Sequence, residues 1–428
     1  MFSGIPPMTS IVLATAVVLA LVAIVVVNVK TAEKRIERRI PHRHPLADPQ
    51  FRREMSVMLG PGIAPDNRID DLQNGREIFP AMLEAIESAH RTITFETYIY
   101  WSGDIGARFS SALSERAGAG VEVKVLLDWV GCMKMDPEQI ERMRASGVEV
   151  RYFRPLRWYN VGRMNNRTHR KLLVVDGRVG FTGGVGIADQ WDGDAGDPEH
   201  WRDMHFRADG PVVAQFQAAF NDNWIRTTGT VLDGEGYFPA LEPAGEMPAQ
   251  MFIASPAGGS ESMRLMYLMA IAAAVESIDM QAAYFVPDAM IIRALLEARR
   301  RGVRIRVTVP GPHIDSEAVR LASRAQWGDL LEAGIEIAEY RPTMMHNKLL
   351  VVDGELVSVG STNFDVRSFE LNEEASLNVY SRPFAARMTA VFEADLALAR
   401  PYTLADWRAR PLRERIKEAV VRPLRSQL

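Results

Sequence analysis

Residues 169–177 read His-Arg-Lys-Leu-Leu-Val-Val-Asp-Gly, and residues 346–354 read His-Asn-Lys-Leu-Leu-Val-Val-Asp-Gly. One match to this spacing of His, Lys and Asp is weak evidence, whereas two matches at equivalent places in one chain indicate a duplicated fold. The four apolar residues are typical of a strand buried on both faces, and Asp-Gly is a tight-turn signal. Each stretch therefore predicts a strand, a turn and a second strand.

The sequence around these stretches repeats as well. Before each of them a helix pattern runs into a short strand pattern, at residues 83–95 in the first copy and 268–280 in the second. Helices that end at glycine and lead into alternating strands follow at residues 120–125, 147–150, 302–307 and 334–337. This alternation indicates an α/β fold of two related lobes, each a mixed sheet flanked by helices.

A proline-rich stretch, residues 239–248, separates the two copies. We therefore expect an N-terminal transmembrane anchor, a basic juxtamembrane segment, a first lobe, a second lobe and a basic amphipathic tail, in that order, at residues 1–30, 31–49, 50–240, 248–405 and 406–428. In the tail, four apolar residues share one helical face among basic ones, namely Leu412, Ile416, Ala419 and Val420. Two interpretations of the tail stay open, a solvated terminal helix and a basic helix lying on anionic lipid.

The predicted anchor rests on residues 11–29, which are apolar except for Thr15 and Asn28 and carry no charge. At 1.5 Å per residue they form about 28 Å of helix, close to the roughly 30 Å hydrocarbon core of a bilayer. A cleaved signal peptide is the alternative, but a basic n-region and a small-residue cleavage site are both missing. Basic residues dominate the following flank, so the positive-inside rule predicts a single-pass anchor with the lobes in the cytoplasm.

The composition excludes several classes of protein. The chain has 428 residues, with 50 Lys and Arg against 54 Asp and Glu and a net charge of −4. This length suffices for two or three domains, and the balance of charge argues against a broadly basic nucleic-acid binder. Cys132 is the only cysteine, which excludes an internal disulfide and a cysteine-based zinc site.

The two His-x-Lys pairs carry the predicted chemistry. His169 and Lys171, like His346 and Lys348, stand two residues apart on a strand, so each pair projects from one face toward one ligand. Two ammonium groups suit the non-bridging oxygens of a phosphate, while two imidazoles provide one nucleophile and one general acid. Such a two-step displacement at phosphorus needs no metal or other cofactor, and the sequence offers no carboxylate cluster that predicts a metal site.

Four acidic residues complete the candidate catalytic set. Asp176 and Asp353 have the opposite parity to their histidines, so we expect them to fix the turn or a neighbouring basic group rather than touch substrate. Asp203 and Glu374 each follow the histidine of their own half and are candidate partners for a second imidazole nitrogen. The alternative for both is an ordinary surface carboxylate.

The duplicated H-x-K-x4-D motif resembles that of the phospholipase D superfamily, over roughly residues 50–428. Within it the chain looks most like bacterial cardiolipin synthases, on the stretches 166–171 and 407–412. The resemblance implies transfer of a phosphatidyl group from phosphatidylglycerol or phosphatidylethanolamine to phosphatidylglycerol, in a bacterial inner membrane. It implies that His169 is the nucleophile, giving a phosphohistidine intermediate, and that His346 is the acid and base.

The superfamily pattern also points to phosphate-binding residues after each motif. The second half carries Ser361 and Asn363, whose side chains are candidate donors to phosphate. The first half has Gly184 and Gly186 at those two places, so it lacks side-chain donors there. Its candidates, Gly183 and Gly184, offer only backbone N–H groups. We therefore expect the two halves to hold phosphate unequally.

Three other functions compete with phosphatidyl transfer. A phospholipid hydrolase differs only in using water as acceptor, which the sequence does not decide. A phosphodiesterase acting on nucleic acid would need a basic surface, and the net charge of −4 argues against that partner. A non-catalytic membrane scaffold would be expected to have lost a His or Lys, and both pairs are intact. The sequence leaves the oligomeric state open.

Overall fold

The structure is a computed structural model that describes residues 15–17, 19–20, 36, 40–156, 166–256 and 261–423. The chain forms two units, residues 1–38 and residues 39–428, and every strand of the described residues belongs to the second unit. Among the described residues, no helix combines the length and the apolar character needed to cross a membrane. The predicted anchor at residues 1–30 lies outside the described residues, apart from 15–17 and 19–20.

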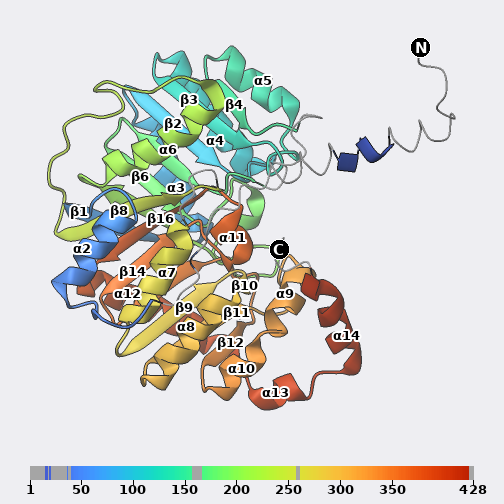
Figure 1. The fold of residues 1–428 in the computed structure, drawn as a ribbon. Helices are drawn as coiled ribbons and strands as arrows, with labels where there is room; N and C mark the ends of the chain where they lie inside the picture. Colours follow the sequence, from blue (N-terminus) through green and yellow to red (C-terminus); the bar gives the residue numbers. More distant parts are fainter. Residues whose placement is uncertain are drawn as a thin grey trace, which may run out of the picture. The chain divides into compact units, whose positions relative to one another are not determined.

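One 15-stranded mixed sheet runs through residues 39–428 (Figure 1). The first half of the chain supplies β1 (Ala64–Gln73), β2 (Thr92–Thr97), β3 (Glu122–Asp128), β4 (Glu149–Phe153), β5 (Leu172–Val175), β6 (Val179–Gly183) and β7 (Met204–Asp209). The second half supplies β8 (Met247–Ala254), β9 (Ser277–Ala282), β11 (Arg304–Pro310), β12 (Glu336–Tyr340), β13 (Lys348–Val352), β14 (Leu356–Gly360), β16 (Glu374–Tyr380) and β17 (Ala399–Tyr402). Two short strands, β10 (Phe285–Val286) and β15 (Phe364–Asp365), pair separately.

The strand order shows the duplication directly. It reads β4-β3-β2-β5-β6-β7-β1 in the first half and β12-β11-β9-β13-β14-β16-β8 in the second, with β17 added at the outer edge. The strands predicted from the repeated patterns are confirmed as β2, β3 and β4 and as β9, β11 and β12. Because β1 pairs antiparallel with β8, the strands of both halves form one continuous sheet. The sequence predicted a sheet in each lobe and gave no sign of this junction, since β1 is polar and does not alternate.

Helices cover both faces of the sheet. The first half has α3 (Asn74–Glu87), α4 (Asp104–Gly118), α5 (Pro137–Ala145) and α6 (Val213–Thr228). The second half has α7 (Ser262–Ala273), α8 (Ala289–Arg300), α9 (Glu317–Arg324), α10 (Trp327–Glu332), α11 (Val366–Glu370) and α12 (Arg382–Ala397). The chain ends in α13 (Leu404–Arg408) and α14 (Leu412–Val421). The helix α2 (Pro49–Met58), from the segment predicted to open the first lobe, packs on α7 of the second half.

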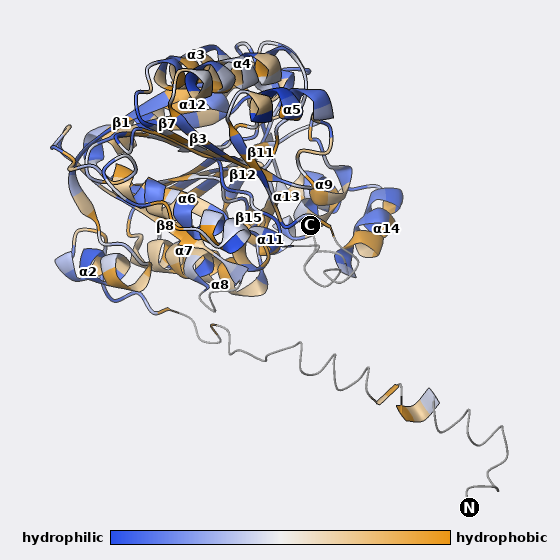
Figure 2. Ribbon diagram, turned by 90° about the horizontal axis from the view of Figure 1, so that it is seen from above, coloured by the Kyte–Doolittle hydropathy of each residue, from blue (hydrophilic) through white to orange (hydrophobic). Residues whose placement is uncertain are grey.

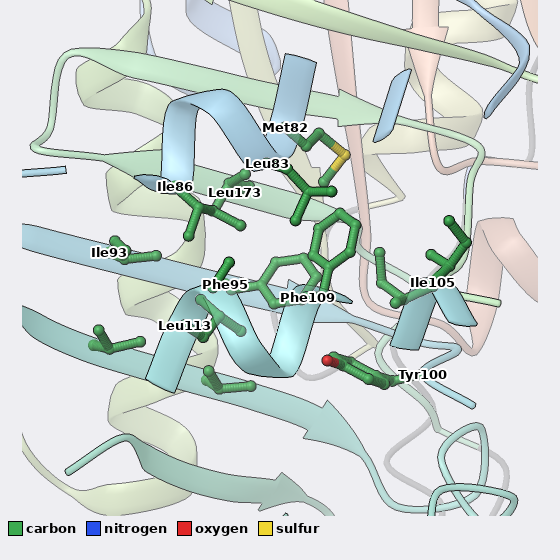
Figure 3. Packing of buried hydrophobic residues seen from close by; sticks show 14 of the residues in the cluster. Met82, Leu83, Ile86, Ile93, Phe95, Tyr100, Ile105, Phe109, Leu113 and Leu173 are labelled. Carbon is green, nitrogen blue, oxygen red and sulfur yellow. The ribbon is translucent and has the colours of Figure 1, made fainter. Parts of the chain in front are cut away.

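The core is divided into two large clusters. One lies between α3, α4 and the first-half strands, where the Phe109 ring stacks on Phe95 at 6.0 Å (Figure 3). Phe109 also meets the Phe79 ring edge-on at 5.8 Å. The other draws apolar side chains from α6, α12 and strands of both halves, including Phe206 and Phe384. A core shared across the β1–β8 junction fixes the two halves relative to each other.

Candidate active site

The first residue of each motif forms a backbone hydrogen bond with the other half of the chain. The His169 N–H donates to the Glu373 carbonyl at 2.8 Å, and the His346 N–H donates to the Arg202 carbonyl at 2.7 Å. Each histidine is thereby placed beside the residue that follows its acceptor in the chain. Those two residues are the predicted carboxylates, Glu374 and Asp203.

The histidine–carboxylate pairs are therefore formed between halves. His169 Nδ1 lies 3.1 Å from both carboxylate oxygens of Glu374, and His346 Nδ1 lies 2.7 Å from Asp203 Oδ2. The sequence places each carboxylate after the histidine of its own half, whereas the structure pairs it with the histidine of the other. When Nδ1 carries the proton and donates a hydrogen bond to the carboxylate, Nε2 is unprotonated and its lone pair is available to a ligand.

Both histidines line the same cavity, which has a volume of about 300 Å³. Its wall includes Lys171 and is completed by residues from both halves: Tyr98, Ile99, Arg167, Trp191, Trp201, Tyr284, Asp315, Ser316, Val319, Asn363, Asp365, Arg367 and Asn372. One cavity thus offers two imidazoles to one ligand.

The two lysines are buried beside their histidines. Lys171 Nζ donates to the His169 carbonyl at 2.8 Å, and Lys348 Nζ donates to the His346 carbonyl at 2.7 Å. Burial lowers the pKa of Lys171 to about 7 and that of Lys348 to about 8. Nearby carboxylates act in the opposite direction on both pKa values but do not outweigh burial. An anionic ligand would favour the charged form of both lysines, so the site is electrostatically matched to an anion.

Burial also sets the protonation of the histidines. It lowers the pKa of His169 to about 4, with the Lys171 charge acting in the same direction and Glu374 against it. The pKa of His346 is lowered by burial and by Lys348. In the cavity without a ligand His169 is therefore neutral near pH 7, which is the state that a nucleophile requires.

The two carboxylates are ionised although they are buried. Burial raises the pKa of Asp203, but His346 and Lys348 outweigh this effect and the net pKa is lowered. The pKa of Glu374 is lowered in the same way, against burial, by His169 and Lys171. Each histidine therefore faces a permanent negative charge from the other half.

Different neighbours support the two carboxylates. Glu374 accepts from Ser361 Oγ at 2.5 Å and from Asn372 Nδ2 at 3.2 Å. Asp203 accepts from the Trp191 indole N–H at 2.9 Å and from the Met204 backbone N–H at 2.8 Å. No sequence signal pointed to Trp191 or its neighbour Trp201, because neither belongs to a repeated pattern.

The predicted phosphate-binding residues occupy three kinds of position. Ser361 Oγ is directed at Glu374, while Asn363 lines the cavity and its Oδ1 has no hydrogen-bond partner among the described residues. Gly184 lies against Asp203, so that an added Cβ would fall 2.1 Å from Asp203 Oδ1. A Cβ at Gly183 would fall 2.5 Å from the Met204 carbonyl. Gly184 thus leaves room for the aspartate that holds His346, and Gly183 leaves room for the neighbouring strand β7.

The residue before each carboxylate forms a buried ion pair with the other half. Glu373 is fully buried and pairs with the fully buried Arg170 at 3.3 Å. Arg202 pairs with Asp395 on α12 at 3.0 Å. The charges are reversed between the two contacts, and we call them together the crossover clamp. Sequence reasoning missed the clamp, although a charge directly before each predicted carboxylate was a usable signal.

Asp176 and Asp353 lie outside the cavity, at the turns that follow β5 and β13. Asp176 accepts from three backbone N–H groups, those of residues 90–92, at 2.7–2.9 Å. Asp353 accepts in the same way from residues 275–277 at 2.8–2.9 Å. Both have positive φ, 52° and 50°, as turns of type I′ require. These carboxylates join each hairpin to the start of β2 or β9.

Aromatic rings flank the two imidazoles. The Tyr98 ring centre lies 5.3 Å from that of His169, and Trp191 and Trp201 lie 5.5 and 5.6 Å from His346. Tyr284 also faces the cavity, and its hydroxyl donates to Asp315 at 2.6 Å. The cavity therefore combines cations with apolar ring surfaces.

Comparison with known proteins agrees with this architecture. Residues 82–224 and 267–396 match the family model described as "Cardiolipin synthase, PLD-like domain". The cardiolipin synthase of Geobacillus thermodenitrificans is 35% identical over 387 residues, which cover 90% of this chain and 76% of that protein. The major cardiolipin synthase of Bacillus subtilis is 34% identical, over 84% of this chain and 75% of that protein.

A solved structure shares the fold at low identity. The crystal structure of phosphatidylserine synthase from Haemophilus influenzae aligns with a TM-score of 0.67 and 12% identity, over 89% of this chain and 99% of that one. At this identity the likeness concerns the fold alone. The matched family model and the relatives carry the assignment: this chain belongs to the phospholipase D superfamily and, within it, to the cardiolipin synthase family.

Proposed function

We propose that the protein makes cardiolipin by transferring a phosphatidyl group to the hydroxyl of phosphatidylglycerol, through a phosphohistidine intermediate. The observation that carries the proposal is that His169 and His346 line one cavity with Lys171, each imidazole held by a buried carboxylate. The similarity to cardiolipin synthases over most of the chain supports the choice of reaction.

In the first step His169 Nε2 forms a bond to the donor phosphorus. The bond from phosphorus to the head-group oxygen breaks, and His346 gives that oxygen its proton. Lys171 and Lys348 face the non-bridging oxygens and offset the charge that develops on them. The bound phosphate itself favours protonation of His346, because a nearby negative charge raises the pKa of an imidazole.

In the second step His346 takes the proton of the acceptor hydroxyl. The acceptor oxygen forms a bond to phosphorus and the phosphorus–nitrogen bond breaks, which returns both histidines to their starting states. Neutral His169, whose pKa burial lowers to about 4, supports its assignment as nucleophile. The assignment of His346 as acid and base follows from the resemblance to the superfamily, in which the histidine of the first motif is often the nucleophile.

The overall organisation is part of the same proposal. A single-pass anchor at residues 1–30 and the basic segment at 31–49 would hold two phospholipase D-like lobes, 50–240 and 248–405, on the cytoplasmic side of a bacterial inner membrane. The apolar run and its basic flank in the sequence support this arrangement. Fractionation of cells is expected to find the protein with the membrane, and removal of residues 1–30 is expected to weaken that association.

Lipid products test the reaction. Purified protein given phosphatidylglycerol, with or without phosphatidylethanolamine, is expected to form cardiolipin by mass spectrometry. Phosphatidic acid as the only product would identify a hydrolase instead. Phosphatidylethanolamine alone offers a donor but no glycerol acceptor, so the intermediate is expected to accumulate. When the protein is then digested without acid, a phosphatidyl adduct is expected on the peptide that contains His169. An adduct on His346 would reverse the two roles.

A further inference from the structure

The helix α14 presents an apolar stripe to solvent. Leu412, Ile416 and Val420 are spaced by four residues and are 70%, 55% and 69% exposed. At 3.6 residues per turn they lie along one side of the helix. Figure 2 shows α14 at the edge of the unit formed by residues 39–428, with both hydrophobic and hydrophilic residues along it. Large apolar side chains that are exposed together indicate a contact surface.

The acidic residues of α14 face the protein instead. Glu414 accepts from Arg324 of α9 at 2.7 Å, and the buried Glu418 accepts from Arg410 at 2.8 and 2.9 Å. Arg410 in turn lies over the Trp407 ring, 4.0 Å from its centre. These contacts hold α14 in one orientation and neutralise both of its carboxylates.

The basic residues of α14 flank the apolar stripe. Arg413 and Lys417 follow it on one side, and Arg415 and Arg422 on the other. In the described part of the chain none of these four forms an ion pair with a carboxylate. An apolar stripe between two rows of cations matches an anionic lipid surface, where the chains accept the stripe and the head groups accept the cations.

The inner side of α14 adjoins the wall of the catalytic cavity. Val421 packs on a small cluster formed by Val286, Val319 and Ala322, together with Tyr284. Val319 and Tyr284 also line the cavity. The helix that carries the apolar stripe is thus connected through one layer of side chains to the wall of the catalytic cavity.

We propose that α14 lies in the surface of an anionic bilayer and seats the catalytic cavity against it. The inference rests on the proposed function, since it takes an anionic phospholipid as substrate. A second copy of the chain is a poorer occupant of the stripe, because a symmetric pairing would bring the same cations together.

A label on the stripe tests the proposal without turnover. The full chain carrying Ile416→Cys is labelled with a polarity-sensitive fluorophore, in a His169→Ala background that leaves the lipid unchanged. Cys132 is buried and does not compete for the label. In vesicles of phosphatidylcholine and phosphatidylglycerol we expect blue-shifted emission that brominated acyl chains quench. In vesicles of phosphatidylcholine alone we expect emission typical of water.

Matched variants identify the cations. The double variant Arg413→Gln, Lys417→Gln removes two cations and is expected to lower the ratio of inserted to exposed label about thirtyfold. The double variant Arg413→Lys, Lys417→Arg keeps both charges and is expected to preserve that ratio. A label at Leu398→Cys, which is 54% exposed at the C-terminal end of α12, is expected to report water throughout.

Three outcomes would overturn the inference: emission typical of water in anionic vesicles, an equal shift at position 398, or a shift in neutral vesicles that grows with protein density, which would indicate a second copy. Cardiolipin formation is measured separately, on the unlabelled chain with His169 intact. If that chain makes cardiolipin while the label of the His169→Ala chain stays in water, this inference fails and the proposed function stands. If the label inserts but the chain with His169 intact makes no cardiolipin, the proposed function fails and the insertion of α14 stands.

Discussion

The two halves of the active site do the same work with different side chains. On the His169 side the carboxylate is Glu374, and a hydroxyl from Ser361 supports it at 2.5 Å. On the His346 side the carboxylate is the shorter Asp203, and an indole N–H from Trp191 supports it at 2.9 Å. Gly184, at the position equivalent to Ser361, leaves the space that Asp203 occupies.

The difference shows which features of the repeat are under chemical constraint. Both sides keep a buried imidazole, a carboxylate on its Nδ1 and a lysine two residues away, although the atoms that hold the carboxylate differ. The clamp follows the same rule, because the ion pairs of Glu373 and Arg202 have opposite polarity at equivalent places. Geometry at the imidazole is preserved, whereas the means of achieving it are free to diverge.

The largest expected effect separates the two histidines. His169→Ala is expected to reduce the rate by about 10⁴-fold with any donor, because no bond to phosphorus forms. His346→Ala is expected to lose about 10²–10⁴-fold with a natural donor, yet to keep release of nitrophenol from a phosphatidyl nitrophenyl ester, which needs no acid. Burst-phase absorbance measures that release. Equal loss of both activities in the two variants would contradict the division of roles.

The clamp is expected to matter next, through stability. Glu373→Gln removes the fully buried carboxylate that Arg154, Arg170 and Arg226 share, and leaves the buried Arg170 paired only with the partly exposed Asp222. This is expected to cost about 3–5 kcal/mol of the free energy of unfolding. Arg202→Gln is expected to cost the same or less, since Arg202 and Asp395 keep some exposure. Denaturant unfolding followed by tryptophan fluorescence measures both. In the control, Glu373→Gln combined with Arg170→Gln is expected to recover part of the loss, and no recovery would argue against the pairing.

Gly184→Ala probes the space on the Asp203 side. The added Cβ would meet Asp203 Oδ1 at 2.1 Å, so the carboxylate must move away from His346 and kcat is expected to fall about 10²-fold. Gly196→Ala is the matched control, because nothing lies within 4 Å of its Cβ. Ser361→Gly removes only one hydrogen bond, so a smaller loss is expected there. An unchanged kcat for Gly184→Ala would contradict the positioning role of the glycine.

The smallest expected effect is on the pH profile. The pKa of Lys171 is lowered to about 7, so above that pH the free enzyme loses the positive charge that attracts the phosphate, and kcat/KM is expected to fall by up to tenfold per pH unit. Lys171→Arg keeps its charge, so the descending limb is expected to move up toward pH 8, where Lys348 loses its proton. A limb that stays at pH 7 in Lys171→Arg would assign it to another group.

Much of the fold was predictable because the repeated elements are locally encoded. The strands around residues 93, 123 and 150 and their partners near 278, 305 and 337 follow from alternating apolar residues entered from a helix. The β1–β8 junction was not predictable, because β1 reads Ala-Pro-Asp-Asn-Arg-Ile-Asp-Asp-Leu-Gln and shows no such alternation. Its pairing is decided by partners distant in the chain.

The site was predictable in its residues more than in its connections. The spacing of His169 and Lys171 predicted that both face one ligand, which the cavity lining agrees with. Parity predicted that Asp176 and Asp353 hold the turns, and their backbone contacts match that expectation. The crossed pairing of carboxylates and the contribution of Trp191 depend on how the halves meet, and no local pattern records that.

The crossed pairing has a consequence for assembly. A polypeptide with only one half would display its imidazole without the carboxylate that orients it, so it would be inert alone. If two such polypeptides paired along the edge that β1 or β8 forms in the whole chain, each copy would supply the carboxylate for the histidine of the other. The tether at residues 239–246 therefore contributes proximity rather than chemistry, because it converts a concentration-dependent encounter into a permanent one.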